Sequence, residues 1–244
     1  MLRALFDDLP VRRPALEWLD LPAVATGADA RDLPVPAPLV RFPHRIHLGG
    51  DAYVNARDAP ARLSPAQPWH VLHRWGKRLG DADVRAHAVS RARAGGRTAP
   101  AAEPEPTWPA REEWLPRVPV LVARERAGSS RGLTMAVKAG HNGERHNHLD
   151  VGSYWVAVDV VAHAGQPTYT ASSFGPDRYR AWPLRGEWHN VPEPGVTQEP
   201  GAASRARDVR FEPTAAGAAL SADLAGAYPG VPRWIRSVRL ERVR

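Results

Sequence analysis

The segment HNGERHNHLD, residues 141–150, concentrates side chains that carry protons and bind metals. It holds three histidines and two carboxylates, and histidine suits acid–base chemistry because its pKa lies near neutrality. His146 and His148 form an H-x-H pair, and on a strand two such residues face the same side and could reach one metal ion. The pattern predicts a catalytic or metal site; the alternative is a pair of solvated histidines in a polar loop.

Two further histidines, His163 in VVAHAGQPTYT and His189 in GEWHNVP, follow in strand-like or turn contexts. Three neutral imidazoles can hold Zn²⁺ and leave a fourth position open. The chain has no cysteine, which excludes disulfides, thiolate ligands and cysteine nucleophiles.

Hydrophobic periodicity divides the chain into three parts. Residues 1–94 are proline-rich and irregular up to a stretch of helical spacing at 67–93, where Gly80 and Asp81 mark a helix stop and a new N-cap. Residues 95–115, rich in Pro, Gly and Glu, have the composition of a linker. Residues 116–244 carry short runs of β-branched and aromatic residues, which predict an incomplete antiparallel β-sandwich. The strand-like runs are 118–125, 131–140, 153–165, 167–172, 207–213, 217–224 and 234–243, with a short extended piece within 50–60.

The charge is strongly basic, with 33 Lys and Arg against 26 Asp and Glu. Only Lys77 and Lys138 are lysines, so the positive charge is almost all arginine, whose guanidinium binds carboxylate and sulfate groups in bidentate fashion. An acidic polymer suits this balance. No stretch reaches the roughly 20 apolar residues of a membrane span. The N-terminal segment lacks the apolar core of a signal peptide, which leaves a cytoplasmic location open.

Two families match the histidine-rich segment to different degrees. GHNGERHNH resembles the opening of the cupin motif, but the expected glutamate is absent from positions 151–153. Four blocks in order, KAGHNGERHNHLDVGSY, GQPTYTASSFGPDRYRAW, EWHNVP and GVTQEPG, resemble the heparinase II/III family of polysaccharide lyases. The cupin-like metal enzyme therefore stands as an alternative, together with a sandwich that binds acidic glycans without catalysis.

The lyase resemblance implies an α/α toroid followed by a β-sandwich, and cleavage of uronic-acid-containing polysaccharide by β-elimination. It makes His146 the catalytic histidine and places Asn147 and Arg185 at the substrate. It implies an acidic polysaccharide as partner rather than nucleic acid, and a periplasmic, cell-envelope or secreted location.

The resemblance also implies a structural zinc ion held by His148 and His189. The third family ligand is an aspartate, and here its position reads His163, with Asp159 as the fallback. The family's catalytic tyrosine comes from the toroid, and no tyrosine of this chain lies in the matching motif. We therefore expect the chain to be a fragment of a lyase, with a short helical remnant of the toroid and little activity of its own.

Overall fold

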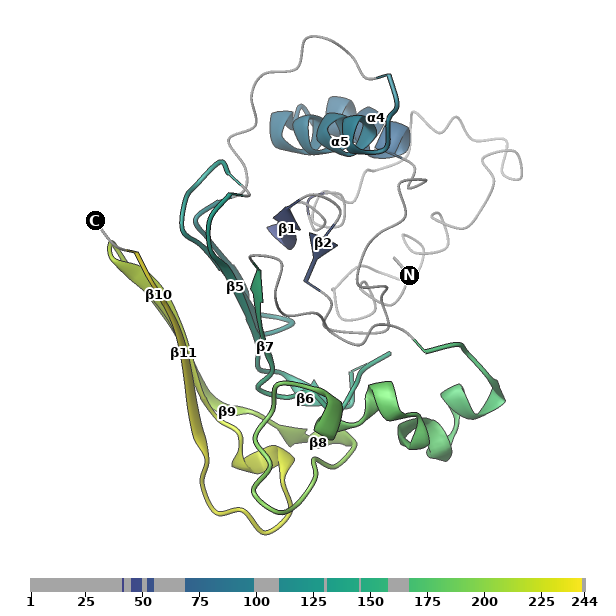
Figure 1. Cartoon of the computed structure of the whole chain (residues 1–244), viewed down its shortest axis with the longest axis vertical. Helices are drawn as coiled ribbons and strands as arrows, with labels where there is room; N and C mark the ends of the chain where they lie inside the picture. The colour runs from purple at the N-terminus through teal and green to yellow at the C-terminus, as the bar shows by residue number, and fades with distance from the viewer. Residues whose placement is uncertain are drawn as a thin grey trace.

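A computed structural model of the chain describes residues 41, 45–49, 52–54, 69–98, 110–129, 131–144, 146–157 and 167–242. Over these residues the fold is mainly β, with two helices at one end of the sheets (Figure 1). Every strand pairing is antiparallel. The predicted fold class, an antiparallel β-sandwich preceded by a short helical part, is confirmed.

The helical part is a pair of packed helices, α4 (Trp69–Arg78) and α5 (Ala82–Ala94). The chain turns between them at Gly80, whose φ of 64° lies in the left-handed region that glycine tolerates. Asp81 then caps α5, because its carboxylate accepts a hydrogen bond from the backbone N–H of Val84 at 3.0 Å. Both the helices and their predicted break are therefore confirmed.

A short hairpin lies beside α5. It is formed by β1 (His47–Gly49) and β2 (Ala52–Tyr53), and the second strand agrees with the extended piece predicted within 50–60. The Tyr53 hydroxyl lies 2.8 Å from Nε2 of His87, and this contact joins the hairpin to the helix.

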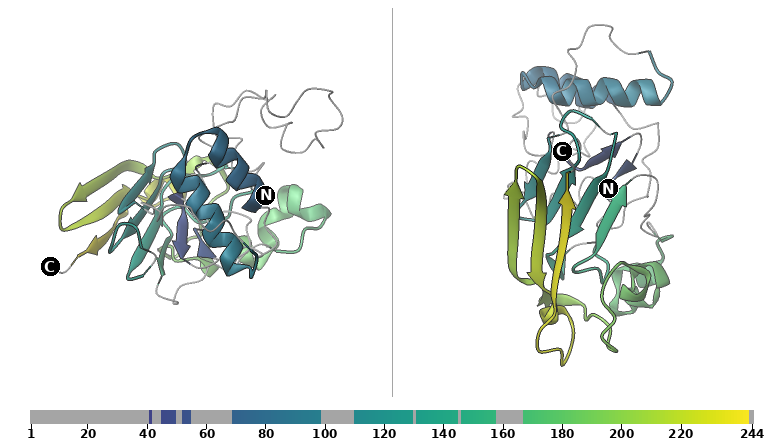
Figure 2. Two further views of the ribbon diagram at one scale, coloured as in Figure 1. Left: turned by 90° about the horizontal axis from the view of Figure 1, so that it is seen from above. Right: turned by 60° about the vertical axis from the view of Figure 1, so that its left-hand side comes forward.

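Two sheets face each other in the sandwich (Figure 2). The first has the order β3-β4-β5-β7 and the second the order β11-β10-β9. The strands of the first sheet are β3 (Glu112–Leu115), β4 (Val120–Arg124), β5 (Thr134–Lys138) and β7 (Tyr154–Ala157). Those of the second are β9 (Arg207–Thr214), β10 (Gly217–Asp223) and β11 (Ile235–Glu241). A small pair, β6 (His141–Asn142) and β8 (Gly201–Arg205), joins residues far apart in the chain.

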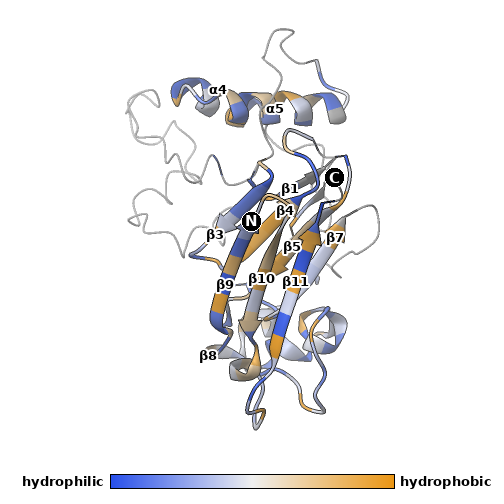
Figure 3. Cartoon of the chain, turned by 90° about the vertical axis from the view of Figure 1, so that its left-hand side faces the viewer, coloured by the Kyte–Doolittle hydropathy of each residue, from blue (hydrophilic) through white to orange (hydrophobic). Residues whose placement is uncertain are grey.

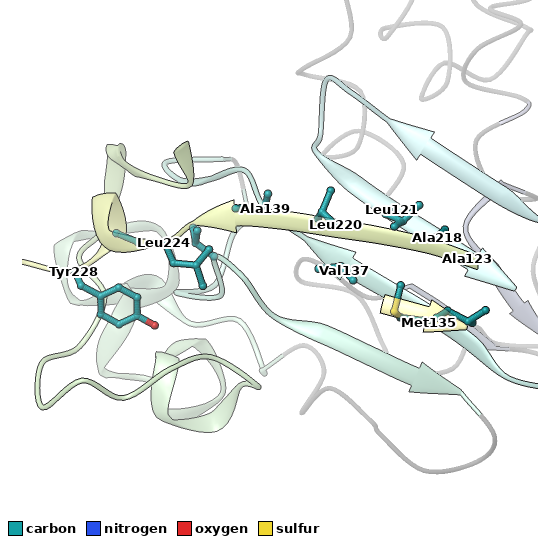
Figure 4. Packing of buried hydrophobic residues seen from close by; sticks show 13 residues of the cluster. Leu121, Ala123, Met135, Val137, Ala139, Ala218, Leu220, Leu224 and Tyr228 are labelled. Carbon is teal, nitrogen blue, oxygen red and sulfur yellow. The ribbon is translucent and has the colours of Figure 1, made fainter. Parts of the chain in front are cut away.

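The core lies between the facing sheets (Figure 4). Leu121 and Val137 project from the first sheet, and Leu220 and Leu240 from the second. Tyr228, from the connection between β10 and β11 that also contains the 3-10 turn η5 (Ala225–Ala227), closes one end of this core. The alternating hydropathy along β9 and β11 is visible in Figure 3 and is typical of strands with one buried face.

Two sequence expectations differ from the structure. Strand β3 lies at 112–115, inside the segment predicted to be a linker. The predicted strand at 167–172 is wrong: residues 167–170 have no regular structure, and η1 (Ala171–Phe174) is a 3-10 helix. The reason is local. Thr170 and Ser173 bond to each other in a capping arrangement, and Gly175 and Pro176 follow at once, so the chain turns instead of extending.

Three more 3-10 turns continue from η1 and lie away from the helical end of the molecule (Figure 1). They are η2 (Pro176–Arg180), η3 (Trp182–Leu184) and η4 (Gly186–Trp188). Within the described ranges, no helix is long and apolar enough to cross a membrane.

Candidate active site

After the two residues of β6, the described residues of the histidine-rich segment form a loop that leads to β7. His146 has a φ of 56°, a left-handed conformation that a residue with a side chain rarely adopts. Its side chain is partly exposed, whereas His148 is fully buried. Residues 146–148 are not in a strand, so the strand geometry that would point both imidazoles to the same side does not apply.

His146 contacts a tyrosine of the same domain. Its Nδ1 lies 3.1 Å from the hydroxyl of Tyr169, and the two ring centroids are 6.2 Å apart. Tyr169 is 37% exposed, so solvent reaches its ring. The pair can exchange a proton through this hydrogen bond. The contact was not predicted, because no tyrosine of this chain was matched to the family's catalytic motif and the two residues are 23 positions apart.

The His146 side chain lines a pocket of about 350 Å³. The loop contributes one wall of this pocket, and η1 and η2 contribute the other. The lining residues are Asn142, Gly143, Glu144, His146, Ser173, Phe174, Gly175, Arg178, Tyr179 and Gly201. The pocket thus combines hydrogen-bonding groups with one exposed phenyl ring.

Arg178 fixes the two walls relative to each other. Its Nη2 donates to the carbonyl oxygen of Asn147 at 2.9 Å, and its Nη1 donates to that of Ser173 at 3.0 Å. One guanidinium therefore bridges the loop and η1. Tyr179 donates to the carbonyl of Asn142 at 3.4 Å, and burial raises the pKa of its phenol.

A buried lysine holds the underside of the loop. Lys138, 1% exposed, donates to Oδ1 of Asn147 at 2.5 Å and to Oδ1 of Asp150 at 2.6 Å. Glu144 lies 3.4 Å from the same ammonium. Burial alone would raise the pKa of Asp150, but the charge of Lys138 and the nearby His189 and His148 together hold that pKa below its usual range. Asp150 is therefore a buried carboxylate whose charge depends on its neighbours.

A single carboxamide ties the two ends of the loop together. Oε1 of Gln198 accepts from Nδ2 of Asn142 at 2.9 Å and from the backbone N–H of Val151 at 3.0 Å. Its Nε2 donates to the Val151 carbonyl at 2.8 Å and to the Tyr228 hydroxyl at 3.0 Å. Gln198 thereby connects the loop to the end of the sandwich core.

His148 and His189 form a second histidine contact, separate from His146. Nδ1 of His148 lies 3.3 Å from Nε2 of His189. Burial lowers the pKa of His189 to about 4, so its imidazole is neutral at physiological pH and can act as a metal ligand. In the part of the chain that the structure describes, no group of three histidine or acidic side chains is arranged to hold a metal. The predicted third ligand, His163, and its fallback, Asp159, lie outside the described residues.

The two predicted substrate contacts occupy different settings. Asn147 is buried, and its Nδ2 donates to the His148 carbonyl at 2.5 Å while its Oδ1 accepts from Lys138. Arg185 is exposed and paired with Glu187 at 2.5 Å, outside the pocket lining. Their roles toward substrate stay predictions.

Comparison with known proteins relates this arrangement to one group of folds. No family model matches the chain, and no curated protein sequence matches it. Among solved structures, it is similar to heparan sulfate lyase HepC from Pedobacter heparinus, with 17% identity and a TM-score of 0.55. It is also similar to a heparinase III, with 17% identity and a TM-score of 0.56.

The aligned region covers most of this chain but only a small part of each solved structure. The alignment covers 84% of this chain but 29% of HepC, and 83% of this chain but 29% of the heparinase III. The chain thus spans under a third of the length of either lyase. At this identity, the matches show that the chain has the fold of the corresponding part of these structures, in agreement with the resemblance found in the sequence.

Proposed function

We propose that the chain forms the β-domain wall of a polysaccharide lyase active site that cleaves uronic-acid-containing polysaccharide by β-elimination. The observation that carries the proposal is the 3.1 Å contact between His146 and Tyr169 at the pocket. This contact joins the pocket-lining His146 to a phenol that can carry a proton, and it supports the proposal. The fold shared with two heparan lyases supports the same reaction class.

The reaction requires a base and an acid close to one sugar unit. The C5–H bond of a uronate is weakly acidic because it lies α to a carboxylate. A base removes this proton, the electron pair forms a C4–C5 double bond, and the C4–O bond breaks. The leaving oxygen then takes a proton from an acid. We assign the base role to His146 and the acid role to Tyr169, whose hydroxyl also bonds the His146 ring. The fixed charge of Arg178 favours an anionic substrate in the pocket.

We propose in addition that zinc binds at His148 and His189. Two nitrogens bonded at about 2.0–2.1 Å to a tetrahedral ion lie about 3.3–3.4 Å apart. The 3.3 Å between these two imidazoles fits that edge. The ion would brace the loop from its buried side, while His146 faces the pocket. His163 is the proposed third ligand.

The lyase proposal is tested by product formation. The 244-residue chain, and any longer protein from the same locus that contains it, are incubated with heparan sulfate and with unsulfated uronate polymers. Unsaturated uronate is followed by its ultraviolet absorbance. We expect the longer protein to release it, the short chain to be slow, and His146→Ala to abolish the signal without changing the circular dichroism spectrum. Full turnover by His146→Ala would contradict the assignment.

The same assay separates the non-catalytic alternative. A folded chain that binds the polymer, while no protein containing it releases unsaturated product, would be a glycan-binding sandwich. Tyr169→Phe provides a second test, because it keeps the ring and removes only the proton. We expect turnover to fall by roughly 10²-fold or more if the phenol takes part in proton transfer.

A further inference from the structure

Phe174 is exposed although it belongs to a class of side chain that proteins usually bury. It is 69% exposed, the largest value among the large hydrophobic side chains that the structure describes. Burying such a side chain is favourable by roughly 2–3 kcal/mol, so leaving it in water has a cost. It lines the same pocket as His146.

The phenyl ring is held by its neighbours. Its centroid lies 5.2 Å from that of Tyr169, whose hydroxyl contacts His146. The turn that carries it is closed by a 2.9 Å hydrogen bond from the Thr170 backbone N–H to the Ser173 hydroxyl. Arg178 then bonds both this turn and the histidine loop. The turn that carries the ring is therefore tied to the loop that carries His146.

We propose that Phe174 is a stacking platform for a pyranose ring of the polysaccharide. One face of a pyranose presents C–H groups, while its rim carries hydroxyl and carboxylate groups. The pocket has the complementary pattern: the exposed phenyl ring of Phe174 shares the lining with the polar groups of Asn142, His146, Arg178 and Tyr179.

The platform rests on the proposed lyase function and deepens it. Phe174 transfers no proton, so it should stabilise the bound substrate and the transition state equally. Its loss should therefore raise KM and Kd and leave kcat nearly unchanged. A change in kcat alone would point to a different role.

The chain offers a matched control. Trp182 is also an exposed aromatic residue, at 53%, and it lies on η3 in edge contact with Trp188. It does not line the pocket. Loss of Trp182 removes a similar exposed ring while leaving the pocket wall in place.

The test measures binding of size-defined heparan sulfate oligosaccharides to the full 244-residue chain by isothermal titration calorimetry. We expect Phe174→Ala to weaken Kd by about fivefold or more, Phe174→Leu to weaken it similarly, and Phe174→Trp to retain binding. Trp182→Ala should bind like the wild type. Circular dichroism of each variant checks folding.

Several outcomes would overturn the platform. They are wild-type affinity in Phe174→Leu, an equal loss in Trp182→Ala, or no binding by the folded wild type. The lyase proposal fails separately. Binding that depends on Phe174, without release of unsaturated uronate by any longer protein, keeps the platform and rejects the reaction.

Discussion

Two buried regions of this molecule are held together by different forces. Between the sheets, Leu121, Val137, Leu220 and Leu240 form an apolar core. Beneath the histidine loop, Lys138 and its carboxylate and amide partners are equally buried but polar. Apolar contacts are non-directional and scale with buried area, whereas each polar group needs a particular partner at a particular angle. The first region should respond to mutation gradually, and the second abruptly.

The largest effect is expected at Lys138. Lys138→Met removes the cation and leaves Asp150 and Glu144 buried without it. Breaking a buried pair on one side typically lowers stability by about 3–5 kcal/mol. The measurement is the free energy of unfolding in urea. A matched double variant, Lys138→Met with Asp150→Asn, should lose less than the single one because it removes one uncompensated charge. A loss below about 1 kcal/mol in the single variant would contradict the polar account.

The apolar comparator is Leu220, which is 2% exposed in the core. Leu220→Ala should lower stability by about 3 kcal/mol, through lost burial and the cavity left behind. Leu220→Met should lower it by less than about 1.5 kcal/mol, because the volume is nearly kept. An equal loss of stability in both variants would show that the core depends on the exact shape of this side chain, as the polar region depends on exact partners.

The loss of stability expected at Gln198 is smaller than that at Lys138 or Leu220. Gln198→Leu leaves Nδ2 of Asn142 and the N–H of Val151 without their shared acceptor. We expect a loss of about 2 kcal/mol in urea unfolding. Gln198→Glu is the matched variant. It keeps oxygen acceptors for Asn142 and Val151, and it removes the N–H groups that donate to the Val151 carbonyl and the Tyr228 hydroxyl. Similar stability of the Leu variant and the wild type would show that the tie across the loop is dispensable.

The smallest effect concerns a polar contact nearer the surface. Backbone N–H groups of Trp234 and Ala225 donate to Asp223 and lower its pKa. The folded carboxylate is thus favoured, so its stabilising effect is present at neutral pH and is lost as the pH falls through the lowered pKa of the folded state. Solvent screening keeps the change under about 1 kcal/mol. Unfolding measured from pH 6 to pH 3 should show a shallower loss in Asp223→Asn, and an identical slope would refute this origin.

The elements that depend on local signals were predictable from the sequence. The helix pair follows from its apolar spacing and from the Gly80–Asp81 break. Most strands follow from β-branched runs. Strand prediction failed at 167–172, because the hydrogen bond between Thr170 and Ser173 offers the backbone an alternative to extension.

The candidate site was predictable in composition but not in arrangement. His146 was identified by its neighbours in the sequence, whereas its contact with Tyr169 spans 23 positions and depends on where η1 packs. Gln198 reaches residues 47 and 56 positions away. Nothing in the sequence around Lys138 indicated its buried role, apart from the rarity of lysine in the chain. Such contacts follow from the tertiary fold and leave no periodic pattern.

The left-handed backbone at His146 has an evolutionary consequence. A residue with a side chain in this conformation costs about 1–2 kcal/mol, which glycine avoids. Selection for stability alone would therefore favour glycine at this position, and only selection for an imidazole would oppose it. If His146 acts as proposed, homologues without the lyase reaction should have glycine or asparagine here more often while keeping Lys138 and Gln198. The residue at position 146 would then distinguish catalytically active homologues from inactive homologues that keep the fold.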